Sequence, residues 1–160
     1  AYDGSTRVFE KLVRADTAII LPVTEDGKII YASQQQPGVK PYIGTIGGRV
    51  DPGEDVLEAA KRELLEESGY EAQEWSLFHA FQPHSKIDWC IWTFIAKGCR
   101  KIAEQDLDGG EKIALEYADL ETFMDLVLEK DFGEEHLKIA FLEAKMHPEK
   151  MAELKRQFLA

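Results

Sequence analysis

The chain has 160 residues, 44% of them hydrophobic and 31% charged, which is the composition of one ordinary globular domain. Its formal net charge of −11 argues against nucleic acids and anionic membranes as partners, and no run approaches the roughly 18 apolar residues of a membrane span. Two cysteines without a Cys/His cluster argue against a disulfide scaffold or a zinc site and favour a reducing compartment. We therefore expect a single cytoplasmic domain over residues 1–160.

The first part of the chain predicts two strands followed by a long loop. Residues 15–23 form a continuous apolar run rich in β-branched side chains, and residues 28–36 alternate in polarity after the turn sequence EDGK. Together they predict a β-hairpin. Residues 37–48 are interrupted by glycine and proline, which predicts a loop with at most a short strand at residues 42–46.

A strong amphipathic helix follows this loop. Asp55 suits its N-cap position, Glu58 three residues later completes a capping-box pattern, and Gly69 is the expected residue just after the helix end. The rest of the chain predicts strands at residues 74–83, 88–98 and 112–118, and helices at residues 119–130, 134–145 and 148–158. These elements predict one α/β domain.

Three glutamates crowd the last turns of the first helix. Glu63, Glu66 and Glu67 fall within one patch about 100° wide on the helix surface, beside its apolar stripe. The C-terminal end of a helix carries partial negative charge, and like charges three or four residues apart repel, so this placement costs stability. Clustered carboxylate oxygens suit Mg²⁺ or Mn²⁺, and such an ion would turn the repulsion into binding energy. The alternative is an ordinary solvated helix surface.

The residues around this patch resemble a known motif. The segment from Gly48 to Tyr70 is similar to the Nudix box, G-x5-E-x7-R-E-U-x-E-E-x-G-U, in which U is a bulky aliphatic residue. The motif covers 23 of the 160 residues, and Tyr70 in its last aliphatic position is the one departure. All seven positions of fixed identity match: Gly48, Glu54, Arg62, Glu63, Glu66, Glu67 and Gly69.

The resemblance implies a fold and a metal site. The fold is a Nudix-type α/β/α sandwich with a mixed sheet and extra C-terminal helices. The cofactor is Mg²⁺, with Mn²⁺ as an alternative, and Glu63 and Glu67 are its expected main ligands together with the carbonyl of Gly47. Glu66 is expected to act either as a ligand or as an acid/base group. Gly48 is expected to let the chain approach the metal and the substrate closely.

Arg62 and Glu54 have an expected supporting role. An ion pair between them would orient the neighbouring carboxylates. The alternative for Arg62 is a surface pair with Glu58 or Glu66, one helical turn away.

Weaker resemblances concern the substrate. Segments before and after the box are similar to the ADP-ribose/ADP-sugar pyrophosphatase branch, in which Pro83 would be a substrate-binding proline. Glu111 would be the loop glutamate that supplies a metal ligand or a general base; its alternative is a solvated loop acid. Residues 43–47 depart from this branch, because they read IGTIG where it often has Glu-Leu-Pro-Ala-Gly.

The reaction implied by the resemblance is metal-assisted hydrolysis of a nucleoside diphosphate linked to another moiety. Arg62, Glu66 and Glu111 form the expected catalytic set. The first substrate class is an ADP-sugar such as ADP-ribose, which yields a nucleoside monophosphate and a sugar phosphate. One alternative is a nucleoside triphosphate pyrophosphohydrolase, and a non-enzymatic alternative is a nucleotide-sensing binding module. The expected partner is a small nucleotide, and the C-terminal helices leave a homodimer open.

Overall fold

The computed structural model describes residues 4–35, 38–107 and 109–159 of the chain. Its strands are β1 (Leu12–Val13), β2 (Thr17–Thr24), β3 (Ile29–Gln35), β4 (Tyr42–Gly44), β5 (Ile46–Arg49), β6 (Tyr70–Glu71), β7 (Glu74–Phe81), β8 (Ile87–Asp88), β9 (Ile91–Lys101) and β10 (Lys112–Ala118). Its helices are α1 (Val56–Ser68), α2 (Leu120–Leu128), α3 (Glu135–Met146) and α4 (Pro148–Leu159).

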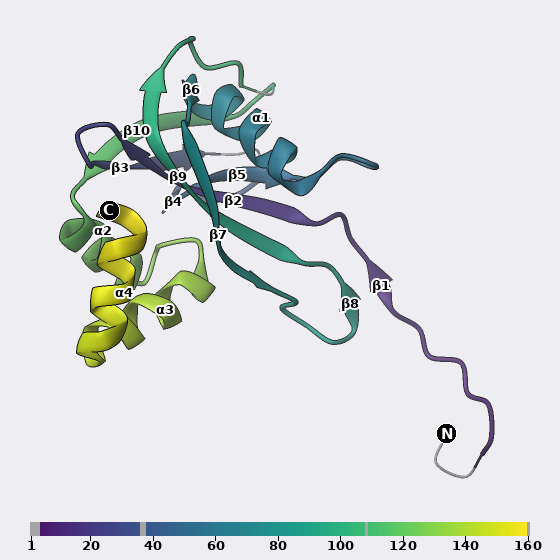
Figure 1. The fold of residues 1–160 in the computed structure, drawn as a ribbon. Helices are drawn as coiled ribbons and strands as arrows, with labels where there is room; N and C mark the ends of the chain where they lie inside the picture. Colours follow the sequence, from purple (N-terminus) through teal and green to yellow (C-terminus); the bar gives the residue numbers. More distant parts are fainter. Residues whose placement is uncertain (1–3, 36–37, 108, 160) are drawn as a thin grey trace.

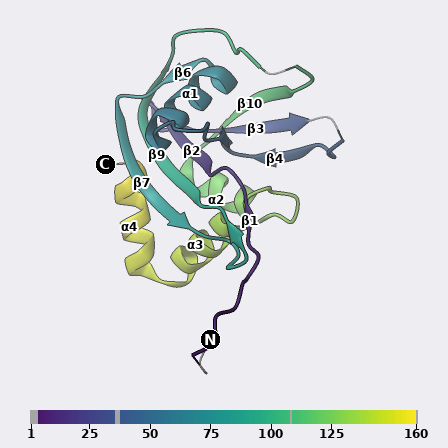
Figure 2. The same ribbon diagram turned by 90° about the vertical axis from the view of Figure 1, so that its right-hand side faces the viewer.

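The strands form a central mixed sheet between two layers of helices (Figure 1). The sheet has the order β10-β3-β2-β9-β6, and β4, β5 and β7 pair with β3, β2 and β9. The pairing of β2 with β9 is parallel, whereas β2 and β3 form the predicted antiparallel hairpin. Helix α1 covers one face of the sheet and α2, α3 and α4 lie on the other side (Figures 1 and 2). The predicted α/β/α sandwich with extra C-terminal helices is confirmed.

Two hydrophobic clusters hold the layers together, one on each face of the sheet. Side chains alternate along β2, so that Leu21 and Val23 join the cluster under α2–α4 while Ala18 and Ile20 join the cluster under α1. The cluster under the C-terminal helices is aromatic, with edge contacts among fully buried rings of Phe123, Phe141 and Phe158. The C-terminal helices therefore share the core of the sheet.

The helix signals were confirmed at both ends of α1. The Asp55 carboxylate accepts hydrogen bonds from the N–H groups of Leu57 and Glu58. Gly69 has a left-handed φ of 74° and donates its N–H to the carbonyl of Leu65. The three later helices also lie where the sequence predicts them, with ends shifted by one or two residues.

Strand β5 was not predicted, because its glycines indicate a loop when the sequence is considered alone. In the structure β5 pairs with β2, and Ile19 lies opposite Gly47. Gly47 has a φ of 152°, and a Cβ atom there would lie 2.3 Å from the carbonyl oxygen of Ala18. Glycine is thus required here for close approach of two strands.

The other differences from prediction are small. The predicted strand at residues 88–98 is divided, so that β9 begins at Ile91 and continues to Lys101. Gln36, at the end of the predicted hairpin, lies outside the described residues.

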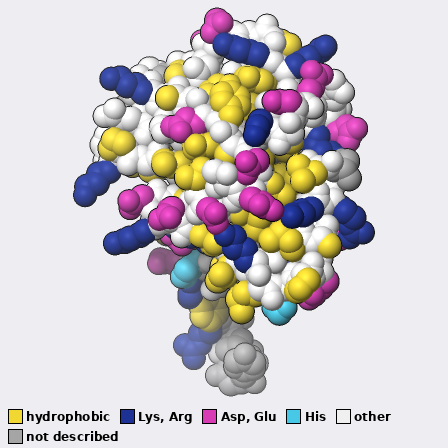
Figure 3. All heavy atoms as spheres, turned by 90° about the vertical axis from the view of Figure 1, so that its left-hand side faces the viewer, with side chains coloured by type: hydrophobic (Ala, Val, Ile, Leu, Met, Phe, Trp, Pro, Cys, Tyr) yellow, Lys and Arg dark blue, Asp and Glu magenta, His cyan; other side chains and the backbone are white. Residues whose placement is uncertain are grey.

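Upstream of the sheet the chain extends away from the body of the molecule (Figure 1). β1 pairs in parallel with β8, and Val8 and Phe9 before it are 92% and 78% exposed. On the face at the left of Figure 1, apolar side chains are interspersed with charged side chains of both signs (Figure 3). Within the described part of the chain, no helix combines the length and the apolar character needed to cross a bilayer.

Candidate active site

The acidic face of α1 turns toward the β5 backbone. Glu67 is only 7% exposed, and its Oε2 accepts a hydrogen bond of 2.9 Å from the N–H of Gly47. The Glu63 side chain is 13% exposed, whereas that of Glu66 is 42% exposed. The solvated-surface alternative therefore does not describe Glu63 and Glu67, which are held against the sheet.

Gly48 leaves the space that the Glu63 carboxylate occupies. A Cβ atom at Gly48 would lie 2.4 Å from Oε1 of Glu63 and about as close to the other atoms of the carboxylate. Any side chain at this position would displace Glu63. The first glycine of the motif is thus explained by the close contact between β5 and α1.

Arg62 binds several carboxylates at once. Its Nε and Nη2 donate to both oxygens of Glu54 at 3.0 and 3.1 Å, in the bidentate geometry that suits a guanidinium. Its Nη1 donates to Glu63 at 2.8 Å and to Glu66 at 3.0 Å, and Nη2 also donates to the carbonyl of Arg49 at 3.1 Å. The structure contains the predicted Arg62–Glu54 pair, and the alternative pair with Glu66 is present as well.

Burial and mutual repulsion raise the pKa values of the glutamates on α1 that face β5. Burial and, to a smaller extent, the carboxylates of Glu63, Glu111 and Glu66 together raise the pKa of Glu67 to about 8, against the hydrogen bond from Gly47. Burial also raises the pKa of Glu63, although Arg62 opposes this shift. The structure therefore keeps carboxylates together at a cost in electrostatic energy.

The C-terminal end of α1 is capped by a segment that sequence reasoning missed. The carbonyl of Glu66 accepts the N–H of Asp106 at 2.8 Å, and the carbonyl of Glu67 accepts the side-chain amide of Gln105 at 2.6 Å. These donors satisfy helix carbonyls that would otherwise lack partners. A local sequence pattern could not reveal them, because they lie about 40 residues further along the chain.

These segments enclose an acidic cavity of about 580 Å³. It brings Glu111 together with the box glutamates, as the sequence predicts, whereas its Asp106, Asp51 and Arg49 were not anticipated. The acidic cavity is lined by Gly47, Gly48, Arg49, Asp51, Arg62, Glu63, Glu66, Glu67, Asp106, Leu107 and Glu111.

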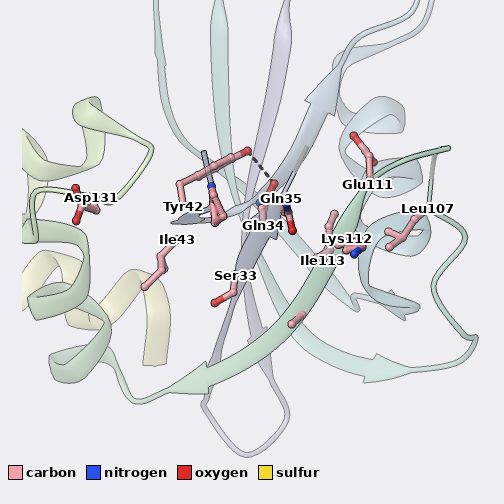
Figure 4. Close-up of a pocket in the computed structure, with 12 residues that line it drawn as sticks. Ser33, Gln34, Gln35, Tyr42, Ile43, Leu107, Glu111, Lys112, Ile113 and Asp131 are labelled. Carbon is pink, nitrogen blue, oxygen red and sulfur yellow. Dashed lines mark hydrogen bonds between the residues drawn. The ribbon is translucent and has the colours of Figure 1, made fainter. Parts of the chain in front are cut away.

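A second cavity of about 580 Å³ adjoins the first and shares Leu107 and Glu111 with it. Figure 4 shows Glu111 beside the start of β10 and the hydroxyl of Tyr42 hydrogen-bonded to Gln34. That hydrogen bond is 2.9 Å long, and Gln34 in turn donates to the carbonyl of Thr45 at 2.6 Å. Burial raises the pKa of Tyr42, and the carboxylates of Glu134, Glu67 and Glu111 raise it further.

Pro83 lies in neither of these cavities. It lines a third one of about 640 Å³, between the sheet and α3, which we call the tryptophan cavity. Its aromatic wall includes Phe81 and Trp89, and the guanidinium of Arg14 lies 4.2 Å from the centre of the Trp89 ring. Glu134, whose pKa is raised by burial, lines the same cavity.

The acidic cavity has the donors that a divalent cation prefers. Among the described residues, no three His, Cys, Asp or Glu side chains are already grouped closely enough to hold an ion. Arg62 instead pairs with Glu63 and Glu66. All the donors are hard oxygens, and a cation between them would offset the burial and the repulsion that raise the pKa of Glu67. The residues therefore fit such an ion.

Comparison with known proteins identifies the family. The model of the NUDIX domain matches residues 13–141, so the chain belongs to the Nudix family. The predicted family is confirmed.

Three curated relatives are similar over most of the domain. The ADP compounds hydrolase NudE of Escherichia coli (strain K12) is 30% identical over 82% of this chain and 72% of its own length. The ADP-ribose pyrophosphatase of Bacillus subtilis (strain 168) is 31% identical over 68% of this chain and 60% of its own length. The methanol dehydrogenase activator of Bacillus methanolicus is 31% identical over 62% of this chain and 55% of its own length. The chain thus spans between 55% and 72% of the length of these relatives.

A solved structure supports the fold. A crystal structure of an ADP compounds hydrolase superposes with a TM-score of 0.70 at 24% identity, over 96% of this chain and 80% of that chain.

The proton affinity of Glu67 predicts how stability depends on pH. The folded protein holds the Glu67 proton up to about pH 8, whereas the ordinary glutamate value is 4.5. The free energy of unfolding of the metal-free protein should therefore fall as pH rises from about 4.5 to 8. Glu67→Gln keeps an oxygen acceptor for Gly47 and removes the buried charge, so at pH 8 it should be more stable than the parent by roughly 2–4 kcal/mol.

Urea denaturation with a chelator present, at pH 5 and pH 8, measures this difference. Glu58→Gln is the matched control on the same helix, because Glu58 is exposed and pairs with Lys61. If the free energy of unfolding changed equally with pH in the parent and in Glu67→Gln, the claim that burial raises the pKa of Glu67 would be contradicted.

Proposed function

We propose that this chain is a Mg²⁺-dependent pyrophosphohydrolase that cleaves the diphosphate of an ADP-sugar such as ADP-ribose. The products would be a nucleoside monophosphate and a sugar phosphate. The observation that carries the proposal is the acidic cavity, in which box carboxylates are buried against β5 at an electrostatic cost. The names of two curated relatives, an ADP compounds hydrolase and an ADP-ribose pyrophosphatase, support the substrate class.

The glutamates of the acidic cavity, Gly47 and Arg62 have proposed roles. Glu63, Glu67, Glu66 and the Gly47 carbonyl would hold the metal. When bound, Mg²⁺ neutralises a diphosphate and lowers the pKa of a water molecule.

A carboxylate must then accept the proton of the attacking water, and Glu66 and Glu111 are the two candidates in the cavity. Arg62 keeps Glu63 and Glu66 in place while its other side is anchored on Glu54.

The tryptophan cavity is the proposed place of the nucleoside. Thr17 and Ile19 line it, and these two residues pair across the sheet with Arg49 and Gly47 of the acidic cavity. The two cavities therefore adjoin the same pair of strands, β2 and β5. An aromatic wall suits a base, and Pro83 would take part in substrate binding from the rim of this cavity.

A substrate panel tests the proposal most broadly. ADP-ribose, other nucleotide sugars, dinucleotides and nucleoside triphosphates would be incubated with Mg²⁺, and the products separated by chromatography. We expect ADP-ribose to give AMP and ribose 5-phosphate. Glu67→Gln should reduce turnover roughly 100-fold or more, because even residues that only support metal ligands cost 10–100-fold.

Glu58→Gln serves again as the control and should keep the turnover of the parent. Release of pyrophosphate from triphosphates alone would favour the triphosphatase alternative. Tight nucleotide binding without turnover would favour the sensing module.

A change at Trp89 tests the nucleoside position. Trp89→Leu should raise KM for the nucleotide sugar about 2–10-fold with a smaller effect on kcat, since an aromatic contact contributes about 0.5–1.5 kcal/mol. Tyr117→Leu is the control, because Tyr117 is half exposed on β10 and lines none of the three cavities. An unchanged KM for a folded Trp89→Leu variant would remove the tryptophan cavity from the substrate path.

A further inference from the structure

The connection from β9 to β10 crosses the C-terminal end of α1. The N–H groups of Ile102 and Ala103 both donate to the carbonyl of Gly69, at 2.8 and 3.1 Å. Asp106 then donates to the carbonyl of Glu66, and Leu107 packs against the core under α1. The chain reaches Glu111 only after these contacts, so the position of Glu111 depends on how this connection is attached.

One side chain in this connection is hydrogen-bonded to both α1 and β10. The Nε2 of Gln105 donates to the carbonyl of Glu67 on α1 at 2.6 Å and to the carbonyl of Ile113 on β10 at 3.2 Å. Ile113 is buried and follows Glu111 by two residues. A single amide nitrogen therefore joins the helix that bears the box carboxylates to the strand that follows Glu111.

We propose that Gln105 is a positioning residue that fixes Glu111 at the acidic cavity, opposite the carboxylates of α1. This inference rests on the proposed function. It adds a residue outside the Nudix box to the residues that assemble the site.

The charges of the cavity explain why such a tether is needed. Glu111 lines the same cavity as the carboxylates of α1, so these groups of like charge repel one another. Repulsion favours outward movement of the connection that carries Glu111. Two hydrogen bonds from one nitrogen oppose this movement, and a displacement of about 1 Å at a reacting group can cost 100-fold in rate.

The amide of Gln105 has the chemistry that this position requires. Both of its partners are carbonyl oxygens, so the side chain must supply two N–H groups from one atom. A carboxylate at this position would place acceptors against acceptors, and a thioether of similar length would supply no strong donor. Gln105→Glu and Gln105→Met therefore remove the tether with little change in volume.

The experiment compares these variants with Glu111→Gln in a double-mutant cycle. With ADP-ribose and Mg²⁺, each Gln105 variant should lower kcat roughly 10–100-fold with KM within about twofold. If Gln105 acts through Glu111, Gln105→Met combined with Glu111→Gln should turn over within about twofold of Glu111→Gln alone. Gln157→Glu on α4 is the control for the added charge and should keep the parent kcat.

Hydrogen exchange provides a readout that does not depend on turnover. In both Gln105 variants the amides of residues 105–113 should exchange faster than in the parent, without metal or substrate, while the amides of the sheet core stay protected. Unchanged exchange in this segment would overturn the inference whatever the activity. The inference would also be overturned if the double mutant lost kcat by the product of the two single-mutant losses, because Gln105 would then act independently of Glu111. Absence of turnover by the parent protein would overturn the proposed function instead.

Discussion

The site depends on the ion pairs that the Arg62 guanidinium makes with the surrounding acids. The described lining of the acidic cavity contains Asp51, Glu63, Glu66, Glu67, Asp106 and Glu111, against only Arg49 and Arg62 as cationic side chains. Arg62 contacts two of these acids and is itself anchored by Glu54 outside the cavity. Its hydrogen bonds raise its pKa above the ordinary arginine value, so its charge is permanent. Without this guanidinium, Glu63 and Glu66 would lose the cation that pairs with both of them.

The fold brings this arrangement together from three separate segments. β5 supplies Gly47, which lets β2 approach, and Gly48, which leaves room for the Glu63 carboxylate. α1 supplies the carboxylates, and the connection after β9 closes the cavity. The hydrophobic cluster under α1 holds this helix against the sheet, and the second cluster holds α2–α4 on the other face. The site can therefore keep like charges together because core packing, and not the site, supplies the stability.

Local sequence signals predicted the parts of this structure that have local causes. The Asp55 cap, the Gly69 terminator, the clustering of Glu63, Glu66 and Glu67 and the Arg62–Glu54 pair all follow from spacing along one helix or from the box that contains it. The prediction was wrong at β5, since the role of Gly47 becomes visible only beside β2. It also missed Gln105 and Asp106, which meet α1 through contacts between distant parts of the chain. The roles assigned to Glu111 and Pro83 stay predictions, and the structure places these residues in different cavities.

The central claim is that the buried carboxylates form a site prepared for a divalent cation. Thermal unfolding of the metal-free protein at pH 8, with and without millimolar Mg²⁺ at constant ionic strength, tests this claim most directly. Mg²⁺ should raise the Tm of the parent by roughly 3–8 °C, because an ion that binds only the folded state stabilises it. The Tm of Glu67→Gln should rise much less. No rise in the parent, or an equal rise in both proteins, would contradict the account.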